Sequence, residues 1–329
     1  MLLTRSTSTR PSPSGTRLAV SEMPRLPNST SFLVPVEIDG DQGLAMVATG
    51  TAEVTLDSAT RKEPSWVSLR FANRIEVKDV PAMVQDLSGL SRQMNVPIKA
   101  LLGVNLLRHL NVTFDYIGGQ FIVRSFTPPI PPAATRIPIA YIKGGGMLMR
   151  SALSTEKGAP YAALLLDSSM SFPIALDQEG WKKAGTDVNK LQPVPQEAKL
   201  KQGLVPLLKL GAFDIPQVPG IFGTPIAEVE KGVEVDIDGV VGSGLLAYFR
   251  VTLTEEGRAM WLEDVPQQPQ QKEPAPAAPS APPAASPPAP APKGDKHEKG
   301  TEKPAEKPTD KPKPKPKSKS LSDGPTSTP

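Results

Sequence analysis

Two stretches of this chain, AMVATG (residues 45–50) and LLLDSS (residues 164–169), share one pattern: an apolar run that ends in small or polar residues. Each is followed later in the chain by two apolar residues and a glycine, in LLGVNLL (residues 101–107) and in VVGSGLL (residues 240–246). A short apolar run bounded by turn residues is typical of a strand buried on both faces. The pattern therefore predicts two strand-rich units built to one plan.

A second similarity links the two halves of the chain. The segments 107–114 and 246–253 align without gaps, and the signals for strands and turns follow the same order in both halves. Neither half is large enough to bury much apolar surface alone. We interpret them as an internal repeat whose units pack about a pseudo-two-fold axis.

At these motifs the chain resembles the retropepsin-like aspartic peptidases, with two lobes in one polypeptide as in pepsin-type enzymes. The segments 111–116 (NVTFDY) and 237–246 also match this family, and the resemblance covers about residues 32–263. It implies a mostly β, bilobal acid-protease (pepsin/retropepsin-like) β-barrel fold with pseudo-two-fold symmetry.

The activity of this family depends on two carboxylates that share one proton, because like charges about 3 Å apart cannot both ionise. One carboxylate takes a proton from a water molecule, and the other hydrogen-bonds the scissile carbonyl. In the family pattern Asp167 aligns with one catalytic Asp, whereas Ala48 stands at the position of the other. The resemblance thus implies that the intramolecular dyad is missing, and that Asp167 titrates more nearly as an ordinary Asp.

The resemblance also assigns supporting roles. The hydroxyl residue after each Asp position braces the loops across the axis, the glycine after it lets backbone approach the carboxylates, and the downstream glycine segment packs beneath the loop. Ser169 departs from the family, because it adds a Cβ where the family has glycine. The supporting positions are Thr49, Gly50, Ser168, Ser169, Gly103 and Gly242.

The composition separates a core from two unusual ends. We expect a disordered N-terminal segment (1–30), an N-terminal lobe (31–126), a Pro-rich linker (127–135), a C-terminal lobe (136–264) and a disordered Pro/Ala/Lys-rich tail (265–329). The tail has few large apolar side chains to offset the entropy of ordering it. It also carries eleven Lys against seven acidic residues, so the net charge of +3 belongs to it. The near-neutral core has no basic stripe with interleaved aromatics, so nucleic acid is not an expected partner.

Local patterns predict the main elements of the core. Alternating apolar residues predict hairpins around residues 39–41, 72–74 and 211–212, and helical spacing predicts helices over 84–94 and 101–110. The three glycines 144–146 predict a turn and not a phosphate loop, because neither a helix nor a Lys-Ser/Thr pair follows them.

Five other acidic or imidazole side chains of the core are candidates for a chemical or a structural role. Asp115 ends a predicted strand and is expected to be structural, and His109 is expected at the surface or at a helix end. Because the core has no second histidine, we expect no metal site, and no cofactor is indicated. Asp57, Asp177 and Glu53 lie near the two loops in sequence and are the candidates for a relocated second carboxylate.

The sequence leaves three functions open. The first is a catalytically degenerate, peptide-binding pseudopeptidase, in which an extended peptide or protein segment lies in the interlobe cleft alongside a flap hairpin (residues 71–77 or 210–213). The second is an active aspartic endopeptidase whose dyad comes from two Asp167 loops in a homodimer, or from a relocated acid. The third is a structural envelope module. Asp167 could also be only a loop residue that hydrogen-bonds its own turn.

The sequence does not decide the compartment. No apolar stretch is long enough for a transmembrane segment, and residues 1–5 are not followed by the apolar core of a signal peptide. An extracytoplasmic location stays open for a longer form of the chain. There is no cysteine, so the redox compartment is open as well. The Lys residues of the tail would suit acidic partners, and the other interpretation is a solvated spacer.

Overall fold

The computed structural model describes residues 13–265, apart from residues 16, 25, 27, 28, 196, 234, 255 and 256. The described residues belong to one unit. The tail predicted for residues 265–329 lies outside the described residues, except for Val265. Within the described part, none of the helices is long and apolar enough to cross a membrane.

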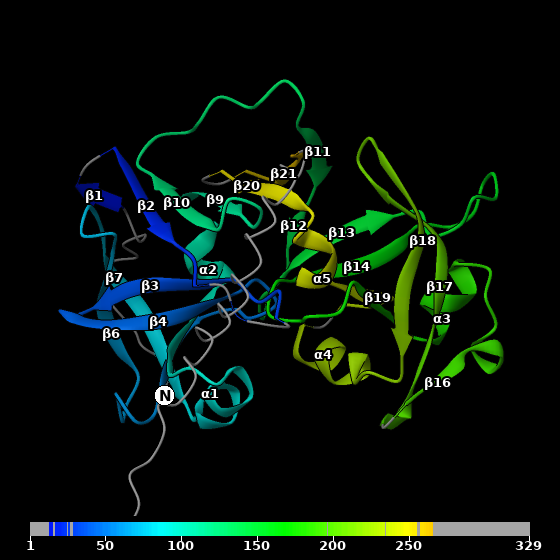
Figure 1. Cartoon of the computed structure of the whole chain (residues 1–329), viewed down its shortest axis with the longest axis horizontal. Coiled ribbons are helices and arrows are strands. Elements are labelled where there is room, and N and C mark those ends of the chain that lie inside the picture. Colours follow the sequence, from blue (N-terminus) through cyan, green and yellow to red (C-terminus); the bar gives the residue numbers. More distant parts are fainter. Residues whose placement is uncertain are drawn as a thin grey trace, which may run out of the picture. The chain divides into compact units, whose positions relative to one another are not determined.

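The first half folds around a seven-stranded sheet with the order β1-β7-β5-β8-β4-β3-β6 (Figure 1). Its central pair, β4 and β8, is parallel and places Val47 beside Leu102 and Ala48 beside Gly103. These two strands are largely apolar, as expected for parallel strands covered on both faces. The strands are β1 (Pro13–Gly15), β3 (Leu33–Ile38), β4 (Asp41–Ala48), β5 (Val54–Asp57), β6 (Ser65–Phe71), β7 (Ile75–Gln85) and β8 (Ile98–Gly103).

The second half folds around an eight-stranded sheet with the order β12-β13-β14-β19-β15-β18-β17-β16. Here β14 lies parallel to β19, and the register places Asp167 beside Gly242. In both halves the strand after the loop (β5 or β15) pairs antiparallel with the glycine strand and parallel with a long hairpin strand. The strands are β12 (Ala140–Tyr141), β13 (Met147–Ser151), β14 (Ala162–Asp167), β15 (Ile174–Leu176), β16 (Gln192–Val194), β17 (Glu197–Leu210), β18 (Phe213–Phe222) and β19 (Gly239–Gly242).

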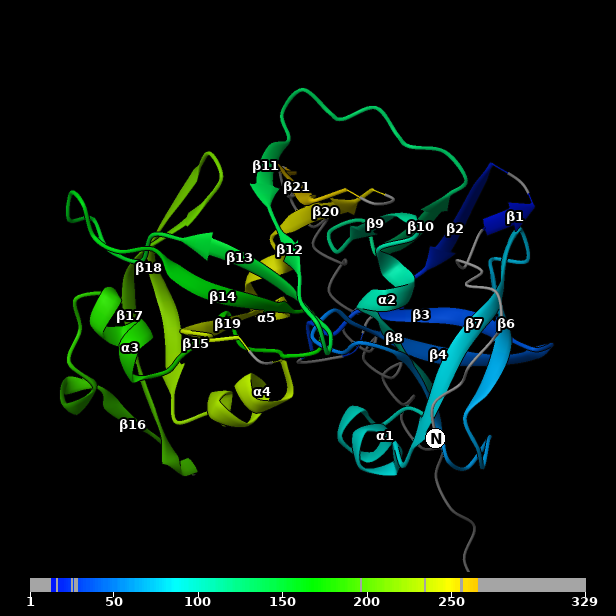
Figure 2. The same cartoon turned by 180° about the vertical axis from the view of Figure 1, so that it is seen from behind.

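A six-stranded sheet, β11-β21-β20-β9-β10-β2, joins the halves (Figure 2). Its central pair is antiparallel and sets Thr113 opposite Thr252, with their hydroxyl oxygens 3.0 Å apart. The two threonines hold the same place in the aligned segments 107–114 and 246–253, so this contact marks the pseudo-two-fold axis. The strands are β2 (Leu18–Glu22), β9 (Asn111–Asp115), β10 (Gln120–Arg124), β11 (Thr135–Pro138), β20 (Phe249–Leu253) and β21 (Ala259–Asp264).

This architecture is the mostly β, bilobal acid-protease fold that the sequence predicted. Each lobe carries one loop between parallel strands, and a shared sheet joins the lobes across the axis. One hydrophobic core runs through both lobes, from Phe32 and Phe71 in the first to Trp181 and Leu253 in the second. The two loops are therefore held by a common frame and not by a flexible hinge.

The N-terminal segment departs from the expected disorder. Residues 18–22 form β2, which pairs with β10 along its full length and buries Ala19 completely. The apolar alternation of Leu18 and Val20 is too short to stand out against the surrounding Ser, Thr, Pro and Arg. Only the free edge of β10 makes these few residues a strand.

The predicted helices are shorter than expected. The helix predicted over 84–94 begins at Ser88, because β7 continues to Gln85 and pairs there with β5. The helix predicted over 101–110 is confined to 104–107, because the preceding residues belong to β8. An apolar run does not by itself distinguish a buried strand from a helix. The helices are α1 (Ser88–Met94), α2 (Val104–Leu107), α3 (Gln178–Lys183), α4 (Ile226–Val233) and α5 (Ser243–Leu246).

Candidate active site

The two motif loops meet at the junction of the lobes. Ala48 is the last residue of β4 and Asp167 is the last residue of β14, so each stands where its loop begins. Ala48 is fully buried, and Asp167 is 7% exposed. The position that would carry a second carboxylate therefore lies inside the protein and carries only a methyl group.

Four hydrogen bonds made by Thr49 and Ser168 tie the loops together. The Thr49 hydroxyl donates to the carbonyl oxygen of Leu166 (2.8 Å) and accepts from the Ser168 backbone N–H (2.9 Å). In return, the Ser168 hydroxyl donates to the carbonyl oxygen of Val47 (2.8 Å) and accepts from the Thr49 backbone N–H (3.2 Å). Both residues are 3% exposed, so water does not compete for these bonds. The arrangement is reciprocal and needs both hydroxyls.

The downstream glycines pack against the loops without room for a side chain. A Cβ on Gly103 would come within 3.0 Å of the Glu53 carbonyl oxygen, and one on Gly242 equally close to the Phe172 carbonyl oxygen. Next to them, the Val104 and Ser243 backbone N–H groups donate to loop carbonyl oxygens at 2.9 and 2.6 Å. Glycine is thus required at both positions by close approach of backbone.

Asp167 is held from both lobes. Its Oδ1 accepts hydrogen bonds from the Ser169 backbone N–H (2.9 Å) and from the Ser169 hydroxyl (2.6 Å), and the carboxylate also accepts from the Gly50 backbone N–H. A Cβ on Gly50 would lie within 3.0 Å of the carboxylate. Ser169, which in the sequence is only a departure from the family, therefore supplies two hydrogen-bond donors to the carboxylate of Asp167. Asp167 does hydrogen-bond its own turn, but it also contacts the opposite loop.

Burial raises the pKa of Asp167 above its ordinary value, although its hydrogen bonds from Ser169 and Gly50 oppose the shift. The expectation that Asp167 titrates more nearly as an ordinary Asp took account of the missing neighbour but not of this loss of solvent. Tyr116, which sequence reasoning did not select, is affected by the same charge. The pKa of its hydroxyl is raised first by burial and then by Asp167. Its ring packs edge-on against Phe32 at 4.8 Å between centroids.

This shift predicts a pH dependence of stability. As pH rises, Asp167 ionises first in the unfolded chain, so the free energy of unfolding falls from about the ordinary pKa of 3.8 until the higher folded pKa is passed. We expect wild type to lose stability relative to Asp167→Asn as pH rises from about 4 to 7. Urea unfolding of both proteins at several pH values measures the difference. A difference that stays constant or grows in favour of wild type would contradict the assignment.

None of the three candidate acids completes a dyad in the described residues. The Asp57 carboxylate accepts from the Leu87 N–H (3.1 Å), and Asp177 caps α3 by accepting from the Gly180 N–H (2.7 Å). Glu53 accepts from the Asn105 side chain. Burial raises the pKa of Asp167 and the hydrogen bonds from Ser169 and Gly50 lower it, and no other described carboxylate is among the causes. The candidates are thus engaged in capping and side-chain contacts of their own.

The first hairpin expected to act as a flap is covered. Its residues Ile75–Val77 pair with β1, and Phe71, Ile75 and Val77 are completely buried in the lobe core. An added peptide strand would have to displace β1. The edge at which a peptide strand was expected to add is thus occupied by β1, and the tip of this hairpin belongs to the sheet of the first lobe.

The second hairpin is also packed at its tip. The Ala212 backbone N–H donates to the Thr135 hydroxyl (2.7 Å), and Phe213 stacks on Phe249 with 5.3 Å between ring centroids. The segment 210–213 thus rests on β11 and β20 and does not stand over the loops as a flap. Nothing in the local sequence distinguishes a packed hairpin from a free one.

The remaining residues take structural places. Asp115 accepts two hydrogen bonds from Arg250 across the central pair of the six-stranded sheet (2.7 and 3.0 Å). His109 follows α2 and accepts from the Arg108 side chain (3.3 Å). The segment Gly144–Gly146 is a turn, as predicted, and all three glycines have positive φ. A Cβ on Gly145 would overlap Ala52 of the other lobe, so this turn closes the interface between the lobes.

Comparisons with known proteins give limited similarity. No family model matches the chain, and no curated protein matches it. Among solved structures, basic 7S globulin from soybean is 8% identical over 76% of this chain and 96% of its own, with a TM-score of 0.49. A retropepsin-like aspartic protease from Rickettsia conorii is 18% identical over 39% of this chain and 90% of its own, with a TM-score of 0.29. The chain is similar to these two proteins at those levels.

Proposed function

We propose that this protein is a catalytically degenerate aspartic-peptidase-like protein that binds an extended peptide or protein segment and does not hydrolyse it. The observation that carries the proposal is the pairing of an intact loop brace with a missing acid. Thr49 and Ser168 make all four bracing hydrogen bonds, yet the residue before Thr49 is Ala48, whereas the residue before Ser168 is Asp167.

The loss of one carboxylate removes a defined part of the chemistry. A lone Asp167 can orient a water molecule, but it has no partner acid to protonate or polarise the scissile carbonyl, a contribution of roughly 10²–10⁴ in rate. Burial favours the neutral form of Asp167 further, and a neutral acid is a poor base. Both effects act against hydrolysis.

The homodimeric alternative would have to dismantle the junction between the lobes. To bring two Asp167 loops together, the first lobe must give up the four hydrogen bonds that Thr49 and Ser168 make between the loops and the pairing of β9 with β20. Removing a partner from a buried hydrogen bond costs about 1–3 kcal/mol for each group left unsatisfied. A dyad formed in this way would therefore compete with the fold itself.

Binding without cleavage would use surface beside the loop. Met170 follows Asp167-Ser168-Ser169 directly and is 38% exposed, which is high for a large apolar side chain next to a buried acid. An extended segment that passes this point would bury the Met170 side chain and approach Asp167. The two packed hairpins described above do not take part in this mode.

A cleavage assay with three variants tests the proposal. We expect wild type and Asp167→Asn to leave a peptide library intact between about pH 3 and 7, and Ala48→Asp to gain pepstatin-sensitive cleavage, because the second carboxylate would face Asp167 again. Ala48→Asn is the matched control, since it adds the same volume without the acid. Pepstatin-sensitive cleavage by wild type that disappears in Asp167→Asn would refute the proposal.

A further inference from the structure

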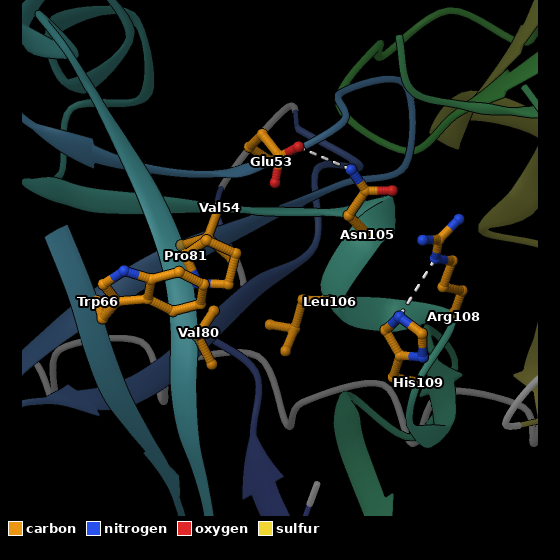
Figure 3. A pocket seen from close by; sticks show the side chains of 9 residues that line it. All are labelled: Glu53, Val54, Trp66, Val80, Pro81, Asn105, Leu106, Arg108 and His109. Atoms are coloured by element: carbon orange, nitrogen blue, oxygen red, sulfur yellow. Dashed lines mark hydrogen bonds between the residues drawn. The ribbon is translucent and has the colours of Figure 1, made fainter. Parts of the chain in front are cut away.

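The first lobe contains a cavity of about 210 Å³ on residues that the proposed function does not use. Its apolar wall is formed by Val54, Val80, Pro81 and Leu106, and the indole ring of Trp66 lies along it (Figure 3). An apolar cavity of roughly 150 Å³ takes a benzene molecule, so this volume suits a ligand of about eight or nine non-hydrogen atoms.

Polar groups of both signs line the rest of the cavity. Figure 3 shows Glu53 and Asn105 at one end and Arg108 with His109 on the side away from Trp66. Asn105 donates to Oε1 of Glu53 (2.8 Å), which fixes the carboxylate. The other carboxylate oxygen of Glu53, Oε2, accepts no hydrogen bond from any described residue. The site therefore offers an oriented acceptor with a negative charge.

The cationic side is fixed in a comparable way. The Nε of Arg108 donates to Nε2 of His109 (3.3 Å), and this contact orients the guanidinium. With the described residues, the terminal nitrogens of Arg108 form neither a hydrogen bond nor an ion pair. A guanidinium whose terminal nitrogens are available can bind a carboxylate, because its planar N–H donors match the two carboxylate oxygens.

The second lobe also has a cavity beside its short helix and its long hairpin strand. Comparing the two cavities shows which features of the first belong to the shared fold and which do not. That cavity, of about 620 Å³, is likewise lined by the short helix (Leu245) and by the long hairpin strand β18, together with Pro173, which precedes the strand after the loop. In the gapless alignment, Arg108 corresponds to Ala247 and His109 to Tyr248. The helix side of the second cavity is formed by Leu245 and Tyr248. The shared fold therefore does not require the charged residues that line the first cavity.

We propose that the cavity of the first lobe binds a free α-amino acid with an apolar side chain. The ammonium group hydrogen-bonds Oε2 of Glu53, the carboxylate pairs with the guanidinium of Arg108, and the side chain covers Trp66, Pro81 and Leu106. Leucine, with nine non-hydrogen atoms, matches the volume. The inference does not depend on the proposed function, because neither Ala48 nor Asp167 lines this cavity, and of the Ala48 loop only its last residue, Glu53, does.

Calorimetric titration of the full chain with three related compounds tests the charges of the ligand. We expect leucine to bind, whereas isoamylamine (no carboxylate) and isocaproate (no amine) should bind at least about tenfold more weakly, because each lacks one charge-assisted hydrogen bond. Absence of leucine binding overturns the proposal. Equal binding of all three compounds also overturns it, since it would mark a purely apolar cavity.

Two substitutions then assign each charge to its residue. Glu53→Gln, which keeps the acceptor for Asn105, should weaken the binding of leucine about tenfold and leave the binding of isocaproate unchanged. Arg108→Gln should weaken leucine about tenfold and leave isoamylamine unchanged. Tyr248→Ala, in the second cavity, is the control and should leave the affinities for all three compounds unchanged. Circular dichroism establishes that each variant is folded, and the three-compound comparison on wild type decides the question if a variant is not. Unchanged leucine affinity in folded Glu53→Gln would overturn the assignment.

Discussion

Thr49→Val is expected to lower the free energy of unfolding by about 2–4 kcal/mol, although valine has nearly the shape of threonine. The substitution removes one hydroxyl that donates to the Leu166 carbonyl and accepts from the Ser168 N–H. Both partners stay buried, and each unsatisfied buried group costs about 1–3 kcal/mol. For a protein of this size the loss corresponds to a fall in melting temperature of roughly 5–15 °C. Chemical denaturation and a thermal melt measure the two quantities.

Thr51→Val is the matched control on the same loop. The Thr51 hydroxyl donates to the Ala48 carbonyl oxygen (2.9 Å) within its own lobe and is only partly buried, so its loss should cost less than about 1 kcal/mol. Combining Thr49→Val with Ser168→Ala should cost less than the sum of the single changes, because the two hydroxyls brace each other's loops. Equal losses for Thr49→Val and Thr51→Val would mean that the brace does not hold the lobes together.

The brace also explains how one acid can be absent while the loop geometry remains. The hydrogen bonds of Thr49 and Ser168 end on backbone atoms of Val47 and Leu166 and on each other, and none of them uses the side chain at position 48 or 167. An alanine at position 48 therefore leaves this contact unbroken, as the proposed loss of the dyad requires. The scaffold and the chemistry are thus separable in this fold.

The fold could be predicted from the sequence because its central strands impose strict requirements. Gly103 and Gly242 are needed where loop carbonyl oxygens approach the backbone, and the strands around them must be apolar on both faces. The same apolar content misled the helix prediction over residues 101–110, where strand and short helix meet at Gly103. The local sequence does not indicate whether an apolar residue here belongs to the strand or to the helix.

The candidate site could be predicted only in part. Asp167 and Ala48 were recognised from a motif, but the role of the Ser169 hydroxyl depends on its position over the carboxylate. The effect of Asp167 on Tyr116 joins residues far apart in the chain, and β1 covers a hairpin tip from a distant segment. Such contacts are set by tertiary packing, and periodicity carries no signal for them.

Gly50→Ala is expected to be among the most destabilising single changes in the protein, at about 3 kcal/mol or more. A Cβ at this position would lie within 3.0 Å of the Cβ, Cγ and Oδ2 atoms of Asp167. The acid cannot swing aside cheaply, because it is buried and bonded to Ser169. Overpacking costs about 1–3 kcal/mol, and the lost hydrogen bonds add to it. Gly232→Ala in α4 is the control, since its Cβ would meet nothing and alanine favours helix by up to about 1 kcal/mol.

The cause of this loss can be isolated in a second background. The three atoms nearest to the added Cβ belong to the Asp167 side chain, so Gly50→Ala should cost less than about 1 kcal/mol in Asp167→Gly. Denaturant unfolding of the four proteins gives the coupling energy directly. A large coupling means that the remaining acid and the glycine of the opposite loop occupy one shared space across the lobe junction. If Gly50→Ala costs the same in both backgrounds, the strain arises elsewhere in the loop, and Asp167 does not rest on Gly50.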